Sequence, residues 1–134
     1  MVTISGEYLG GVATLMTHGP SGAKLQTDAP KDNGGNGEDF SPTDLLATAY
    51  GSCVMTIMAL RAKDWQLDLS GLRVQVEKQM TQTAPRRVAK LVVRVQLPQN
   101  LSPNDVDRLV DAGKTCPVAL SVNLAEGVEW HVNS

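Results

Sequence analysis

The segment Ser41–Asp64, SPTDLLATAYGSCVMTIMALRAKD, determines how the rest of the chain has to fold. It opens with Ser41 as a helix N-cap, Pro42 at the first helical position and Asp44 near the positive helix end. Apolar residues then recur at intervals of three and four, which predicts one buried stripe along a helix ending near Asp64. The stripe comprises Leu45, Ala49, Cys53, Ile57 and Leu60, broadened by Leu46, Val54 and Met58.

The charge-free part of this segment, residues 45–60, is shorter than the roughly 20 apolar residues that a membrane span needs. Polar side chains such as Thr48, Ser52 and Thr56 also interrupt it. We therefore interpret it as a helix buried within the domain or between subunits, and not as a membrane anchor.

The segments on either side of this helix have strand patterns. Residues 1–28 contain strand-forming residues around a turn at 18–22, and a glycine-rich loop at 29–41 leads into the helix. Residues 72–80 alternate apolar and polar, and residues 88–97 are rich in β-branched side chains. Ser102-Pro103-Asn104-Asp105 repeats the helix-start signature before a helix that reaches Thr115, followed by a short helical turn at 118–120 and a strand at 127–132. This order of strands and helices predicts a single α+β domain over residues 1–134.

Composition excludes several classes of function. Of the 134 residues, 42% are hydrophobic and 19% charged, and the formal net charge of −2 comes without any basic run, so we expect no nucleic-acid partner. The first residues lack the basic and apolar regions of a signal peptide, which favours a cytoplasmic location. A permanent disulfide is improbable in that compartment, so the two cysteines are either inert core residues or redox-active thiols.

Each cysteine allows both interpretations. Cys53 lies on the apolar stripe, where a free cysteine commonly packs as a small hydrophobe, and the nearest cation in its own segment is Arg61. Cys116 precedes Pro117, which would place its sulfur at a helix N-cap, where free backbone N–H groups lower a thiol pKa. The two do not form a CxxC motif, which excludes a thioredoxin-type dithiol.

Other site chemistries have little support. The only histidines, His18 and His131, are not spaced with a cysteine as zinc ligands are, and no nucleotide-binding glycine motif is present. Glu77 and Glu129 could act as acid–base groups, although exposed strand carboxylates are far commoner. We therefore expect no metal and no cofactor.

Two segments together resemble a known family. The first is Phe40-Ser41-Pro42-Thr43-Asp44-Leu45-Leu46-Ala47 leading to Gly51-Ser52-Cys53, and the second is Cys116-Pro117-Val118-Ala119-Leu120-Ser121, 63 residues after Cys53. In this order and at this separation in the sequence, the two segments resemble the paired cysteine motifs of the OsmC/Ohr (osmotically inducible/organic hydroperoxide resistance) family.

The resemblance implies an OsmC-like α+β fold with antiparallel sheets, a long central helix and two intertwined subunits. It also implies a peroxidase in which Cys53 attacks a hydroperoxide and becomes a sulfenic acid, which Cys116 resolves to a disulfide. An external dithiol must then reduce that disulfide. The expected partners are a second copy of the chain, the hydroperoxide and the reductant.

The sequence departs from the family in the groups that activate the thiolate. Organic hydroperoxide enzymes of the family use a glutamate after the motif proline and an arginine from the early hairpin. Thr43 stands in the place of the glutamate with Asp44 beside it, and no arginine precedes Arg61. The candidate replacements are Asp44, Lys24, His18, Arg86 and Arg87. The departure leaves two alternatives open: a dimer that binds a small apolar ligand in an interfacial pocket, and a purely structural homodimer.

Overall fold

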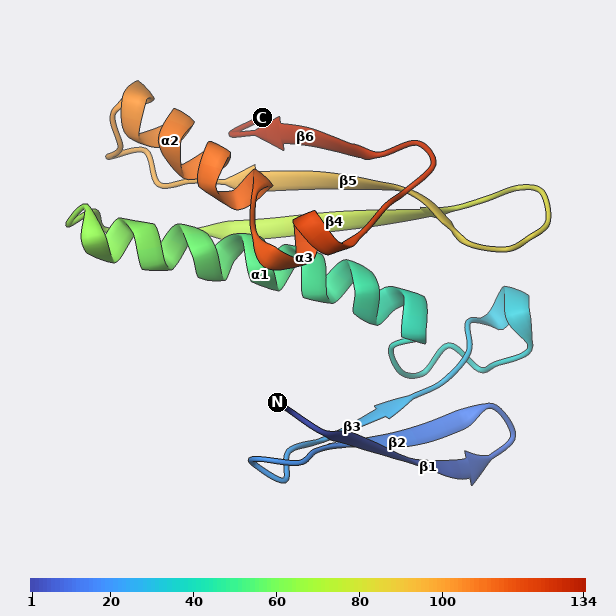
Figure 1. Ribbon diagram of the computed structural model, residues 1–134. Helices are drawn as coiled ribbons and strands as arrows, with labels where there is room; N and C mark the ends of the chain where they lie inside the picture. The colour runs from blue at the N-terminus through green and yellow to red at the C-terminus, as the bar shows by residue number, and fades with distance from the viewer. The chain divides into compact units, whose positions relative to one another are not determined.

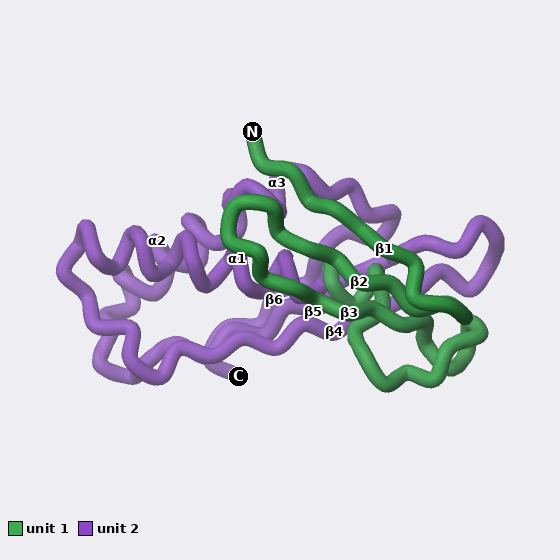
Figure 2. Tube along the Cα trace, turned by 90° about the horizontal axis from the view of Figure 1, so that it is seen from below, with its two compact units in different colours: residues 1–46 green, residues 47–134 purple.

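The computed structural model describes all 134 residues, in two compact units formed by residues 1–46 and 47–134 (Figure 2). The elements, labelled in Figure 1, follow the predicted order of strands, long helix, hairpin, helix and strand. In chain order they are β1 (Ile4–Gly10), β2 (Ala13–His18), β3 (Lys24–Thr27), the 3₁₀ turn η1 (Lys31–Asn33), α1 (Pro42–Asp64), β4 (Arg73–Met80), β5 (Val88–Gln96), α2 (Pro103–Lys114), α3 (Pro117–Ser121) and β6 (Val128–Val132). The α+β class is confirmed.

The N-terminal unit is an antiparallel sheet of order β1-β2-β3. The predicted turn is present, and the His18 N–H donates to the Ala23 carbonyl across it. The long loop that follows is ordered around Asp28, whose carboxylate accepts hydrogen bonds from the N–H groups of Ala29 and Asn36. A carboxylate that collects backbone donors in this way supplies the hydrogen bonds that an irregular segment cannot make with itself.

The C-terminal unit contains a sheet of order β4-β5-β6, and this sheet is mixed. β4 and β5 form the predicted antiparallel hairpin, but β6 runs parallel to β5. The expectation of antiparallel sheets is therefore wrong for β6. Parallel neighbours need a crossover connection, and α2 and α3 provide it between the two strands.

The predicted buried stripe of α1 is wrong, although the predicted extent of the helix is confirmed. Cys53 and Ile57 are only partly buried, and Ala49 and Leu60 are exposed. Of the predicted apolar positions, only Val54 and Met58, which broadened the stripe, are buried. The full buried set is Ala47, Tyr50, Gly51, Val54, Met58 and Ala62. A helix that is apolar on most sides has no single periodic stripe, so the close fit of small side chains decides which face packs inward.

The packing around Gly51 explains why this face of α1 is buried. A Cβ atom at Gly51 would lie 2.8 Å from Val76 Cγ2 and 3.3 Å from Val74 Cγ1. The α1 backbone therefore lies directly on the inner face of β4, at a distance that only glycine permits. Figure 1 shows α1 running lengthwise along this sheet.

A second glycine brings α2 close to the same buried face of α1. A Cβ atom at Gly113 would lie 2.9 Å from Met58 Cε and 3.1 Å from Val54 Cγ1. α2 starts as the sequence predicts, because Ser102 is the N-cap and its Oγ accepts from the Asp105 N–H at 3.1 Å.

α1 also has the length and apolar composition of a membrane span, with a mean hydropathy of 1.4 over its most apolar window. Only 33% of that window is buried within the chain. A core helix of a soluble protein passes the same test, and the contacts at Gly51 identify α1 as a helix packed on a sheet.

Replacing Gly51 with valine should destabilise the fold by about 1–3 kcal/mol, the usual cost of overpacking a close contact. The measurement is the free energy of unfolding in urea. Lys63→Val is the matched control, because it places the same β-branched residue at an exposed position of α1. Equal stability losses in the two variants would show that Gly51 is not a packing constraint.

Candidate active site

The two cysteines come from different elements of the C-terminal unit. Cys53 lies in the middle of α1 and is partly buried, while Cys116 is fully buried in the corner between α2 and α3. Gly113, which packs on α1, precedes Cys116 by three residues, and the Cys116 N–H donates to its carbonyl at 3.3 Å. The contact between α1 and α2 thus places Cys116 close to α1.

The structure brings the two thiols together. Both are free, and Cys53 lies close enough to Cys116 to raise the pKa of the Cys116 thiol. Thiols 63 positions apart in the sequence therefore influence one another, as a reversible disulfide between them would require.

Cys116 is the N-cap of α3, as its position before Pro117 predicts. Its Sγ accepts a hydrogen bond from the Ala119 N–H at 3.4 Å. The expected lowering of its thiol pKa is nevertheless wrong. Burial raises the pKa of Cys116, and the hydrogen bond and charge of Cys53 raise it further, while the backbone N–H groups of Ala119 and Val118 lower it only in part. Burial prevails because a thiolate loses its hydration in the apolar corner.

A tyrosine next to the cysteines was missed by the sequence interpretation. Tyr50 is buried one helical turn before Cys53, and its ring lies 6.3 Å from that of Trp130 on β6. The pKa of Tyr50 is raised by burial, then by the charges of Cys116 and Cys53, so the phenol keeps its proton beside both sulfurs. The spacing of three residues from Cys53 was the available signal, because such residues are neighbours on a helix.

The predicted activating residues have other local roles. Asp44 caps α1, since its Oδ2 accepts from the Ser41 N–H at 2.9 Å while the Asp44 N–H donates to Ser41 Oγ. Lys24 lies exposed on β3, and Arg86 lies in the exposed hairpin turn. Arg87 donates from Nη2 to the Asn123 carbonyl at 3.3 Å. No arginine figures among the groups that shift the pKa of Cys116.

The remaining candidates also have partners of their own. His18 Nδ1 lies 2.6 Å from Ser21 Oγ in the hairpin turn of the N-terminal unit. Glu129 binds Lys90 and His131, and both neighbours lower the pKa of its carboxyl group. Glu77 accepts from Gln79 on the exposed side of β4. These carboxylates are surface groups of the sheet.

Removing Cys53 should lower the pKa of Cys116 without restoring the ordinary value of a thiol. Cys53→Ala deletes two of the causes that raise this pKa, but burial, the largest cause, remains. The pH dependence of Cys116 alkylation, followed by mass spectrometry, measures the change. Thr56→Ala, one turn further along α1, is the control that should leave this pKa unaltered. A pKa of Cys116 that does not move in Cys53→Ala would contradict the proximity of the two thiols.

The fold and site define a class of protein: a small α+β protein that holds two free thiols together between a central helix and a helix N-cap. The OsmC-like protein family model matches residues 35–132, which includes both cysteines. The chain therefore belongs to the OsmC-like family. No curated protein sequence matches it.

Solved structures agree with this assignment. A Psychrobacter arcticus protein, provisionally described as an osmotic stress induced and detoxification response protein, is 36% identical, with a TM-score of 0.92 over 98% of this chain and 96% of its own. The organic hydroperoxide resistance protein OsmC of Legionella pneumophila is 18% identical, with a TM-score of 0.79 over 100% and 97%. An organic hydroperoxide resistance protein of Elizabethkingia anophelis, with thiocyanate bound, is 17% identical, with a TM-score of 0.78 over 100% and 97%. The last two comparisons establish the shared fold.

Proposed function

We propose that this protein is a thiol peroxidase that reduces organic hydroperoxides with Cys53 and Cys116. The observation that carries the proposal is that two free thiols from distant segments lie close enough for one to raise the pKa of the other. Membership of the OsmC-like family and the similarity to proteins described as organic hydroperoxide resistance proteins support the choice of substrate.

The reaction follows from general thiol chemistry. The Cys53 thiolate attacks one oxygen of the hydroperoxide, forming an S–O bond while the O–O bond breaks and the alkoxide leaves, taking a proton to become an alcohol. Cys116 then loses its proton and attacks the Cys53 sulfenic acid, forming the S–S bond as water departs. An external dithiol returns the disulfide to two thiols and is itself oxidised.

The electrostatics of the pair favour this assignment of roles. Because burial and Cys53 raise the pKa of Cys116, Cys116 keeps its proton and can donate it in a hydrogen bond to the Cys53 thiolate. The partly buried position of Cys53 gives a hydroperoxide access to its sulfur, whereas the sulfur of Cys116 is enclosed. The protonated hydroxyl of Tyr50 is a further donor beside the same sulfur pair.

One equivalent of cumene hydroperoxide should consume both thiols and reduce the mass of the chain by about 2 Da, the two hydrogen atoms lost when a disulfide forms. Thiol titration and intact-mass spectrometry measure this. Cys116→Ser should instead accumulate a Cys53 sulfenic acid that dimedone traps, and Cys53→Ser should leave the peroxide unconsumed. If both thiols of the native protein survive excess peroxide, the peroxidase proposal fails and a non-catalytic ligand-binding dimer is favoured.

We further propose that the chain acts as a homodimer. All seven residues of β1 are exposed, and Leu60 of α1 is 54% exposed, although the helix is long and apolar. Strands need a covered apolar face for stability, and exposed apolar patches of this kind mark protein interfaces. A second copy would cover the free side of α1 and complete the site.

Sedimentation analysis of the native protein should therefore give about twice the chain mass of 14.3 kDa. Leu60→Asp places a charge on the exposed apolar side of α1 and should weaken association by tenfold or more, because an unpaired carboxylate in an interface is costly. Gln82→Asp, in the exposed hairpin turn, is the control with the same change of charge. A native protein that remains a single chain at micromolar concentration would disprove the dimer.

A further inference from the structure

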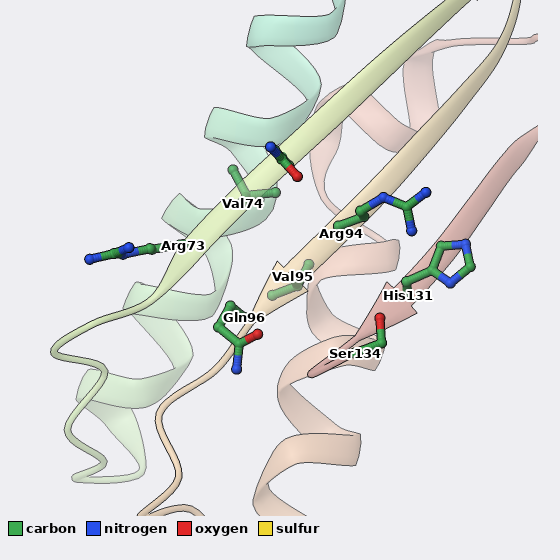
Figure 3. A pocket seen from close by; sticks show the side chains of 8 residues that line it. Arg73, Val74, Arg94, Val95, Gln96, His131 and Ser134 are labelled. Carbon is green, nitrogen blue, oxygen red and sulfur yellow. The ribbon is translucent and has the colours of Figure 1, made fainter.

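The outer face of the β4-β5-β6 sheet has a cleft of about 290 Å³ that the cysteine chemistry does not use. Val74 and Val76 contact Gly51 of α1, so the alternate residues Arg73 and Gln75 point to the opposite side of the sheet. The cleft opens on that opposite side, as the close view in Figure 3 shows. Its lining residues are Arg73, Val74, Gln75, Arg94, Val95, Gln96, His131 and Ser134.

The chemistry of the lining selects for an anion. Two arginines, a histidine, two amides and a hydroxyl line the cleft, and no acidic side chain does, although the whole chain has a net charge of −2. Neither Arg73 nor Arg94 forms an ion pair within the chain. Guanidinium groups without a carboxylate partner, close to hydrogen-bonding amides, are the usual means of binding carboxylates and phosphates.

The sheet register holds the polar groups in a row. Gln75, Arg94 and His131 are direct neighbours across the three strands, and Arg73 lies opposite Gln96 at the end of the sheet. In Figure 3 the guanidinium group of Arg94 extends toward the His131 ring. Strand positions are rigid, so these donors are positioned before a ligand arrives.

A carboxylate outside the cleft orients the histidine. His131 Nε2 lies 2.6 Å from Glu129 Oε1, and Glu129 also binds Lys90 on the neighbouring strand. The pKa of Glu129 is lowered by Lys90 first and by His131 next, so the carboxylate stays charged and accepts a hydrogen bond from the ring. This fixes the imidazole beside the Arg94 side chain. Its Nδ1 can donate to an anionic ligand when the ring carries both protons.

We propose that this cleft binds a small organic molecule with a carboxylate or phosphate group, held mainly by Arg94 and His131 with Arg73 at the rim. Its volume is near the lower end of the roughly 300–1,000 Å³ typical of small-molecule pockets, which suits a compact anion. The sheet separates the cleft from α1 and its Cys53, so binding is independent of the proposed peroxidase reaction.

Titrations of the full-length protein with phenyl phosphate, benzoate and neutral benzamide, at constant ionic strength, test the proposal by NMR. One or both anions should give saturable shifts at Arg94, His131 and their neighbours, whereas benzamide should not. The tighter of the two anions identifies phosphate or carboxylate as the preferred group. Absence of saturable shifts, shifts centred elsewhere, or equal shifts with benzamide would overturn the proposal.

Variants of Arg94 provide the quantitative test. Arg94→Gln should weaken anion binding by about tenfold, the loss expected for one charge-assisted hydrogen bond. Arg94→Lys, which keeps the charge but not the forked donors, should bind with intermediate affinity. Lys63→Gln makes the same change of charge at an exposed site on α1 and should bind as the native protein does. If Lys63→Gln weakens anion binding as much as Arg94→Gln does, the weakening comes from the change in net charge alone. That result would disprove the site.

Discussion

The close contact between α1 and the sheet at Gly51 is the constraint on which the C-terminal unit depends. The helix backbone lies against Val74 and Val76 because no side chain separates them. With this face fixed, Val54 and Met58 are presented to α2, and Gly113 allows α2 to approach them as closely. The chain then turns at Cys116, which places its thiol close enough to Cys53 for Cys53 to raise its pKa. Two glycine contacts thus determine the geometry of the thiol pair.

The thiol pair itself shows two opposing electrostatic effects. A helix N-cap stabilises a thiolate through backbone N–H groups, and Cys116 has this position. Burial opposes it, and burial is the larger effect, so the pKa of Cys116 is raised. In this pair of sulfurs with unequal exposure, the enclosed thiol of Cys116 holds its proton, while the thiol of Cys53 remains partly accessible. This difference between the two thiols is a property of the pair, because each sulfur is part of the environment of the other.

The two faces of the β4-β5-β6 sheet carry different kinds of side chain. Its inner face is aliphatic and supports α1, while its outer face carries the Lys90–Glu129–His131 group and the unpaired arginines of the cleft. The strict alternation of β4 separates them, with Val74 and Val76 on one side and Arg73 and Gln75 on the other. One face of a three-stranded sheet therefore supports the helix that carries Cys53, while the other face presents charged side chains to solvent.

The sequence by itself determined the local structure of this protein. The Ser41 and Ser102 caps, the alternation along β4 and the position of Cys116 before Pro117 were all readable, because each depends on neighbours within a few residues. The paired cysteine motifs also indicated the family, which the family model confirms. Only the tertiary structure decided the buried face of α1, the parallel direction of β6, the raised pKa of Cys116 and the proximity of Tyr50 to both sulfurs. These depend on contacts between residues far apart in the chain, and a helix apolar on most sides leaves its orientation to those contacts.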